Sequence, residues 1–236
     1  AASYDNINVV GRPLNCIYVF RDHGFYTDDS QVSYYYIDGK KVPLRGAYGN
    51  QFYQTGDRVY LDSDGNGRIN SDYGLNEDRV SAGSPLPKAQ GGIISSLNWK
   101  GFDVNVSFAF MLGRHILNKT QSESIGTFLG TDPNDVAKPI FADLSEISFW
   151  EKPGDIADYP ANRLENGLMN FAPNIASNVE NVSFLKCKTL TIGYTIPEFL
   201  KKKIGFGARI FVSAENLFTL TNYSGRDPET VDVVTG

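Results

Sequence analysis

One stretch of sequence, residues 93–112, limits what this chain can fold into. After Lys100 and Gly101 every second residue is apolar, while the residues between them are mostly small or polar. This period of two predicts a β-strand and excludes an amphipathic helix. If Lys100 and Gly101 form a two-residue hairpin loop, Trp99 pairs with Phe102 and both strands share one apolar face. The apolar positions after the loop are Phe102, Val104, Val106, Phe108, Phe110 and Leu112.

The apolar face of this predicted hairpin has the length of a membrane-crossing strand. Large apolar side chains continue for about ten residues, which is what a tilted strand needs to cross a bilayer. A strand of a soluble β-sandwich shows the same alternation. The hairpin alone therefore leaves both classes of protein open.

Composition narrows the choice of class. Thirteen Tyr, fifteen Phe and 23 Gly in 236 residues favour strands and turns over helices. A net charge of −5 argues against a nucleic-acid surface. A run of about 18 apolar residues is absent, which excludes a transmembrane helix but not a β-barrel, whose strands alternate. Cys16 and Cys187 are interpreted as two buried free thiols, with a single bridge as the alternative.

The sharpest candidate site is an acidic loop that follows Leu61. It matches the first nine positions of a calcium loop, with oxygen side chains at alternate positions and glycine at the tight turn. It departs at the last position, where Tyr73 replaces the bidentate glutamate and Glu77 or Asp78 could serve instead. The alternative is a metal-free loop in which Asp and Asn cap their own backbone. The predicted Ca²⁺ ligands are Asp62, Asp64, Asn66, the Arg68 carbonyl, Asn70 and Asp72.

Two blocks of sequence carry family motifs. Residues 56–70 read Gly-Asp-Arg-Val-Tyr-Leu-Asp-Ser-Asp-Gly-Asn-Gly-Arg-Ile-Asn, and they lead into the hairpin. Residues 181–197 are followed by residues 215–229, which read Glu-Asn-Leu-Phe-Thr-Leu-Thr-Asn-Tyr-Ser-Gly-Arg-Asp-Pro-Glu. In this order the blocks resemble SusC/RagA-type TonB-dependent outer-membrane transporters. The resemblance extends over most of the chain.

This resemblance implies a fold and a function. The fold expected is all-β, the C-terminal fragment of a 22-stranded antiparallel transmembrane β-barrel with long extracellular loops. The function expected is import of glycans or peptides across the outer membrane, with a SusD-like surface lipoprotein as a lid. TonB would act through an N-terminal plug that this sequence does not contain. Other expected partners are the rest of the barrel and outer-membrane lipid, whereas nucleic acid is not expected.

The resemblance also divides the chain into segments. Residues 190–196 alternate apolar and small polar side chains, and residues 198–207 form a basic turn before the return strand. The segment from 218 onward would precede a last strand that is absent. The expected segments are a barrel strand region (1–27), an extracellular loop (28–90), a transmembrane hairpin (91–113), a long extracellular loop (114–181), a second hairpin with a periplasmic turn (182–217) and an extracellular loop (218–236).

One alternative of a different class remains open at this stage. A secreted β-sandwich that binds carbohydrate, stiffened by calcium at residues 62–70, would show similar strands. Catalysis is not expected, because His23 and His115 have no metal-spacing partners and no nucleophile motif occurs. The aromatic residues of the long loop are expected to pack on one another. These residues are Phe141, Phe149, Trp150, Tyr159 and Phe171.

Overall fold

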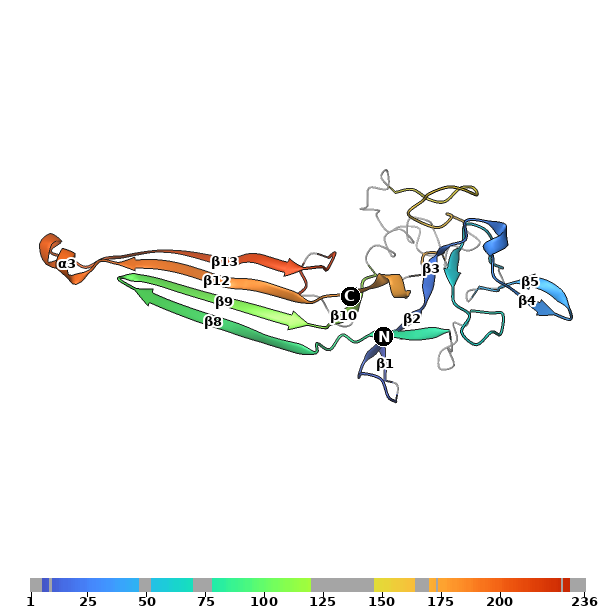
Figure 1. The fold of residues 1–236 in the computed structure, drawn as a ribbon, viewed down its shortest axis with the longest axis horizontal. Coiled ribbons are helices and arrows are strands. Elements are labelled where there is room, and N and C mark those ends of the chain that lie inside the picture. Colours follow the sequence, from blue (N-terminus) through green and yellow to red (C-terminus); the bar gives the residue numbers. More distant parts are fainter. Residues whose placement is uncertain are drawn as a thin grey trace, which may run out of the picture. The chain divides into compact units, whose positions relative to one another are not determined.

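Almost all regular elements of the described residues are β-strands, and the chain divides into two compact units (Figure 1). The computed structural model describes residues 6–8, 10–46, 52–69, 78–119, 147–163, 170–172, 174–225 and 227–229. One unit comprises residues 1–84, 116–180 and 233–236, and the other comprises residues 85–115 and 181–232. We call them the loop unit and the sheet unit. The predicted all-β character is confirmed for the described residues.

The sheet unit contains one antiparallel sheet of four long strands in the order β13-β12-β9-β8 (Figure 1). Trp99 pairs with Phe102 and Ala89 pairs with Leu112, so the hairpin has the register that the sequence predicts. Each strand is about twice the usual length of five to six residues. The strands are β8 (Ala89–Trp99), β9 (Phe102–Leu112), β12 (Phe184–Thr195) and β13 (Arg209–Thr221).

Two of the three connections between the strands of this sheet are short, whereas the third, from β9 to β12, passes through the loop unit. Lys100 and Gly101 have φ angles of 46° and 89°, the left-handed pair that a tight hairpin turn requires. Between β12 and β13 the sequence predicts a turn, whereas the structure has a short helix, α3 (Glu198–Ile204). Strong helix formers follow Pro197 there, and Gly205 at φ 82° ends the helix. Among the described residues, no helix is long and apolar enough to span a membrane.

The four strands give the sheet two different ends. The turn at Lys100 and the helix α3 lie at the same end, because Thr195 pairs with Arg209 and Tyr194 pairs with Phe102. At the opposite end the chain enters β8 and β12 and leaves β9 and β13. Within this unit the two short connections therefore lie at one end, and the chain enters and leaves the sheet at the other.

The loop unit consists of short strands around an aromatic core. The core contains Phe20, Tyr26, Tyr60, Ile69 and Ile175, all at most 2% exposed. The central strand of this unit begins at Cys16, which is a free buried thiol like Cys187, as predicted. The strand pairings are β1 (Asn6–Ile7) and β7 (Arg79–Gly83) on β2 (Cys16–Phe20), β3 (Asp22–Phe25) with β6 (Arg58–Tyr60), β4 (Tyr34–Ile37) with β5 (Lys40–Pro43), and β10 (His115–Leu117) with β11 (Val179–Asn181).

Two turns of 3-10 helix complete the described elements, η1 (Asp29–Gln31) and η2 (Ala176–Asn178). The Asp28 carboxylate caps η1 by accepting a bond from the Ser30 backbone N–H at 2.7 Å. The Asp22 carboxylate accepts bonds from the backbone N–H and the hydroxyl of Ser177, which ties η2 to β3. Short polar contacts of this kind stabilise irregular segments that have no long strand ladder.

The long loop packs on the turn at Gly56 and Asp57. The Asp57 carboxylate is fully buried and accepts hydrogen bonds from Asn170 at 3.0 Å and from the Gln54 backbone N–H at 2.9 Å. A Cβ built on Gly56 would lie 2.2 Å from the ring of Trp150, so this glycine allows the loop to approach. The predicted aromatic packing is present, since Phe149 contacts Tyr159 and Phe171 with ring centroids 6.0 and 6.1 Å apart. Phe141 lies outside the described residues.

Candidate functional site

The four-stranded sheet of the sheet unit has one face made of large apolar side chains. Pairing brings Val106 of β9 opposite Leu190 of β12, and Ile192 opposite both Val104 and Val212. Phe102 and Tyr194 stack with ring centroids 4.6 Å apart near the turn end. We call this surface the apolar face. It comprises Ile93, Leu97, Trp99, Phe102, Val104, Val106, Phe108, Phe110, Leu112, Leu190, Ile192, Tyr194, Ile210 and Val212.

Much of the apolar face is exposed. Trp99 is 62% exposed, Leu97 63%, Ile210 72% and Val212 72%. Soluble proteins rarely expose a contiguous apolar surface of this extent, and such a surface marks contact with a partner or a membrane. A sandwich would cover it with a second sheet, but the described strands of this unit form a single sheet. The sandwich alternative is therefore not favoured.

The opposite face of the sheet carries most of the polar side chains, which are hydrogen-bonded across the strands, together with the exposed apolar residues Ile94 and Phe211. Ser107 and Thr189 hydroxyls lie 2.6 Å apart. Arg209 of β13 reaches over β12 to Asp103 of β9, with Nη2 and Oδ2 2.6 Å apart. Gly193 lies beneath this bridge, and a Cβ there would lie 2.5 Å from Asp103 Oδ1. We call this surface the polar face, and its cross-strand bonds suit water rather than lipid.

A β-bulge in β12 keeps these two faces separate along the whole strand. The register shifts between Cys187 and Thr189, so Lys188 is an extra residue relative to β9. Without the bulge, the alternation of Leu190 and Ile192 would continue to Lys188 and Lys186 on the apolar face. With it, Cys187 pairs with Phe108 on the apolar face, while Lys186 pairs with Ala109 on the polar face. The bulge therefore removes Lys186 from the apolar face.

The lysines beside the bulge hold the segment that follows β13. Lys186 Nζ lies 3.1 Å from carboxylate oxygens of both Asp227 and Glu229. Lys188 Nζ lies 2.5 Å from Glu229 Oε1. We call these four residues the lysine latch. Sequence reasoning did not single them out, although two lysines continuing an apolar alternation were a signal.

The lysine latch should open in acid. The backbone N–H of Glu229 lowers the pKa of Asp227, and the Lys188 ammonium lowers the pKa of Glu229. A carboxylate with a depressed folded pKa stabilises the folded state above its unfolded pKa and loses that contribution as pH falls through the folded value. The protection factor of residues 222–229, which is the intrinsic exchange rate divided by the measured rate at the same pH, should therefore fall at pH values below the ordinary Asp and Glu range. A protection factor that is unchanged from neutral to acid pH would contradict this latch.

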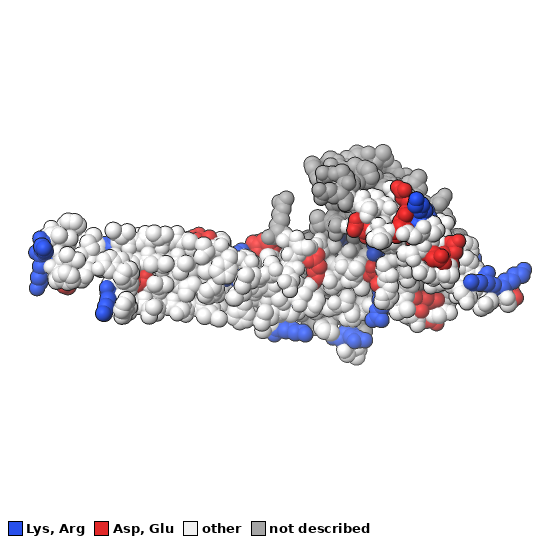
Figure 2. All heavy atoms as spheres, turned by 45° about the horizontal axis from the view of Figure 1, so that its top comes forward, with Lys and Arg blue, Asp and Glu red and all other residues white. Residues whose placement is uncertain are grey.

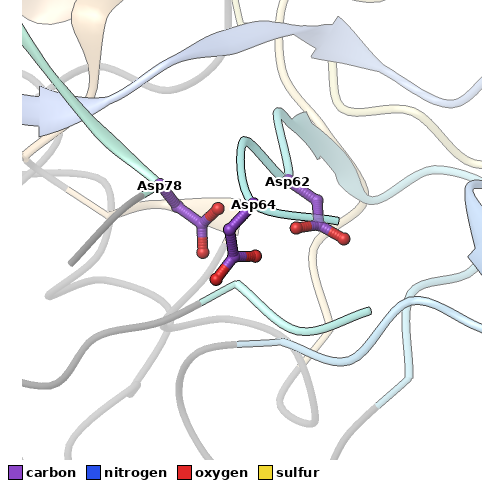
Figure 3. A group of neighbouring side chains, drawn as sticks. All are labelled: Asp62, Asp64 and Asp78. Carbon is purple, nitrogen blue, oxygen red and sulfur yellow. The ribbon is translucent and has the colours of Figure 1, made fainter. Parts of the chain in front are cut away.

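In the loop unit, three carboxylates of the acidic loop lie close together (Figure 3). Oxygens of Asp62, Asp64 and Asp78 all lie within 4.8 Å of one another. Asp78 comes from the start of β7, is fully buried, and accepts a 2.7 Å bond from the Ser63 N–H. Burial, with the neighbouring Asp64 adding to it, raises the pKa of Asp62. Ionising Asp62 is therefore unfavourable in this environment. A cation placed among these oxygens would favour the ionised carboxylates and offset that cost.

The loop also makes the bonds that the metal-free interpretation expects. Asp62 accepts from the Gly65 and Gly67 N–H groups at 2.9 Å each, and the Asn66 side chain accepts from the Arg68 N–H at 2.8 Å. Gly67 packs against the Tyr35 ring, which excludes a side chain there. Two of the predicted ligands, Asn70 and Asp72, lie outside the described residues, as do Tyr73 and Glu77. The fold places Asp78, which the sequence indicated as an alternative ligand, beside Asp62 and Asp64.

The sequence of this chain was compared with those of known proteins. No family model matches the chain. TonB-dependent receptor P3 of Formosa agariphila is 31% identical over 175 residues, which is 74% of this chain and 15% of the relative. The TonB-dependent receptor SusC of Bacteroides thetaiotaomicron is 23% identical over 180 residues, 73% of this chain and 15% of that protein. The chain is a relative of the SusC/RagA-type TonB-dependent receptors. The resemblance read from the motifs is thereby confirmed.

Solved structures of SusC/RagA-type proteins share the fold. A structure of the RagAB peptide transporter matches 97% of this chain and 21% of its own, with a TM-score of 0.55 and 19% identity. The closed-closed state of the RagAB peptide importer matches 98% of this chain and 22% of its own, with a TM-score of 0.52 and 21% identity. The SusC/RagA-like segment described here thus spans about a fifth of those chains and about 15% of the curated relatives.

Proposed function

We propose that this chain is part of a TonB-dependent transporter of the outer membrane, and that its sheet is part of the wall of a closed β-barrel. The observation that carries the proposal is the apolar face, which is exposed along strands of 11 to 13 residues. Strands of about 9 to 11 residues cross a bilayer when tilted, with apolar side chains toward lipid and polar ones toward the lumen. The strands of the sheet are long enough to cross a bilayer, and their side chains are divided between an apolar face and a polar face.

The remaining strands of the barrel come from outside this chain. Within the described residues, β8 and β13 are the edge strands of the sheet. An open strand edge cannot face lipid, because its backbone polar groups would have no partner there. Further strands on both sides, for a total of 22, complete the wall. Long segments at the end opposite α3 then lie on the cell exterior, with the lysine latch among them, and the turns lie in the periplasm.

The transported substrate is a glycan or a peptide, and the partners are a SusD-like surface lipoprotein that covers the exterior mouth and TonB acting through a plug. Support for this part of the proposal comes from the relatives, one described as SusC and another as a peptide transporter. Transport rather than catalysis also fits relatives that are described as receptors.

The transport proposal is tested in cells that express the full-length protein. Outer-membrane fractions should contain it, and pull-down from those membranes should recover a surface lipoprotein. Uptake of labelled oligosaccharide and oligopeptide pools should then be compared between cells with and without the gene. Loss of uptake of one pool in cells without the gene identifies the substrate class. Recovery of the protein in the soluble fraction would contradict the proposal.

We also propose that Ca²⁺ binds the acidic loop and stiffens it. The support is the convergence of Asp62, Asp64 and Asp78, three carboxylates supplied from two parts of the chain. Hard oxygen ligands of this kind suit Ca²⁺, with the Asn66 side chain, the Arg68 carbonyl, Asn70 and Asp72 as further candidates. The ion would neutralise repulsion among the carboxylates and join the loop to the start of β7.

Calcium should stabilise the protein in a saturable manner. We expect the melting temperature of the full-length protein to rise with added CaCl₂ and to fall again with chelator, because the ion binds the folded state alone. The shift should disappear in Asp62→Asn and in Asp78→Asn. Asp155→Asn, which alters a half-buried aspartate elsewhere in the loop unit, is the matched control and should keep the shift. An equal shift in wild type and Asp62→Asn would assign the loop to the metal-free form.

A further inference from the structure

The turn end of the sheet unit carries a cluster of positive charge (Figure 2). Helix α3 ends with Lys201, Lys202 and Lys203, and Lys100 occupies the neighbouring hairpin turn. The two turns are in contact, since the Thr195 N–H donates to the Gly101 carbonyl at 2.7 Å. Glu198 is the acidic residue of this helix, and its carboxylate is bound to Lys201 at 2.5 Å. Among the described residues, Lys202 and Lys203 form no ion pair.

Exposed aromatic and aliphatic side chains accompany these lysines. Phe199 is 71% exposed, Phe206 62% and Ile204 43%. On the helix, Leu200 and Ile204 are four residues apart and share one side, Lys202 lies opposite them, and Lys201 and Lys203 lie at the two flanks. Among the described residues of the sheet unit, no contact buries the two phenylalanines. A short segment that combines exposed apolar and basic side chains is typical of a membrane interface.

The cluster directly borders the apolar face. Trp99, Phe102 and Tyr194 are the last large residues of that face at the turn end, and Lys100 Nζ lies 5.1 Å above the Trp99 ring. At this end of the strands, aromatic residues are therefore followed directly by lysines. If lipid covers the apolar face, this order places the aromatic residues at the head-group level and the lysine ammonium groups at the phosphates.

We propose that the α3 end of the sheet binds the phosphate groups of anionic phospholipids in the facing leaflet, with Lys100, Lys201, Lys202 and Lys203 as the cations and Phe199 and Phe206 inserted at the acyl boundary. This inference rests on the proposed outer-membrane location. Charge complementarity and the continuity of the cluster with the apolar face select a lipid as the partner. A free anion would have no use for two exposed phenylalanines, whereas a lipid covers them and the lysines together.

The test uses the full-length protein in detergent that contains phosphatidylglycerol and phosphatidylcholine. Native mass spectrometry reports how many molecules of each lipid are retained. We expect wild type to prefer phosphatidylglycerol, and the triple variant Lys201→Gln, Lys202→Gln, Lys203→Gln to lose at least about tenfold of that preference. The matched control, Lys40→Gln, Lys41→Gln, Lys152→Gln, removes three lysines of the loop unit and should keep it. The variant Phe199→Ser with Phe206→Ser should retain fewer molecules of both lipids.

The outcomes separate this inference from the proposed function. Resistance of the membrane-bound protein to carbonate extraction tests insertion, and it should be equal in wild type and in all three variants. Insertion without a phosphatidylglycerol preference, or a preference that the triple variant keeps, would overturn the lipid site alone. Displacement of phosphatidylglycerol by inorganic phosphate at equal concentration would also overturn it, because the site would then be a general anion site. A wild-type protein that carbonate extracts would overturn the proposed function itself.

Discussion

Arginine in place of Val106 should destabilise the membrane-inserted protein by about 2 to 4 kcal/mol, the cost of a cation on the lipid side of a barrel near the bilayer midplane. Val106 lies on the apolar face, half-way along β9, where it pairs with Ser95 and Leu190. Its polar neighbour on that face is Ser95, a single neutral hydroxyl that cannot balance the charge of a guanidinium. The free energy of unfolding from lipid vesicles, measured by urea titration of the full-length protein, reports the loss.

The adjacent position provides the control for that substitution. Asn105 lies on the polar face opposite Ser96 and Thr191, so the arginine of Asn105→Arg would enter a hydrated, hydrogen-bonding surface. We expect a change within about 0.5 kcal/mol, the usual range for a surface position away from special features. Equal losses for Val106→Arg and Asn105→Arg would mean that the two faces of β9 do not differ in environment. That result would contradict the barrel.

The second large effect is expected in the loop unit, at Gly56. Gly56→Ala should destabilise this unit by roughly 2 to 4 kcal/mol, because it combines a left-handed backbone at φ 88° with a methyl group 2.2 Å from the Trp150 ring. Neither the ring nor the Ala161 Cβ, at 2.9 Å, is the end of a flexible side chain. Hydrogen exchange at Trp150 and Ala161, whose N–H groups bond to the Tyr159 and Gly56 carbonyls, should rise together.

Gly154 is a control position at which substitution causes backbone strain without a steric clash. It has φ 93°, close to that of Gly56, but no atom lies within 4 Å of the position its Cβ would take. Gly154→Ala should therefore show backbone strain alone, about 1 to 2 kcal/mol. A loss at Gly56→Ala no larger than at Gly154→Ala would show that the long loop does not dock on the turn at Gly56 as described.

Predictions from the sequence agree best with the structure where a short local motif determines the backbone. The register of β8 on β9 followed from one two-residue turn at Lys100 and Gly101, because a hairpin loop fixes every later pair. The division of β9 into two faces needed nothing more than a period of two.

Non-local contacts account for what sequence reasoning missed. The bulge at Cys187 to Thr189 lies beside Lys186, whose carboxylate partners come more than forty residues later in the sequence, a contact that the local sequence does not show. The same holds for the approach of Trp150 to Gly56. In the acidic loop, Asp62 and Asp64 were singled out by spacing, whereas Asp78 is placed by β7. α3 was taken for a turn because seven residues are too few for helical periodicity to be recognised.

A structure of the full-length protein in a lipid nanodisc tests the central claim most directly. We predict that β8 and β13 each pair with a further strand, that the wall closes, and that Val106 and Phe108 contact lipid while Asp103 and Arg209 face a hydrated lumen. The contradicting result is equally specific. It is a second sheet packed on the apolar face across a dry core about 10 Å thick, which would make the sheet half of a soluble sandwich.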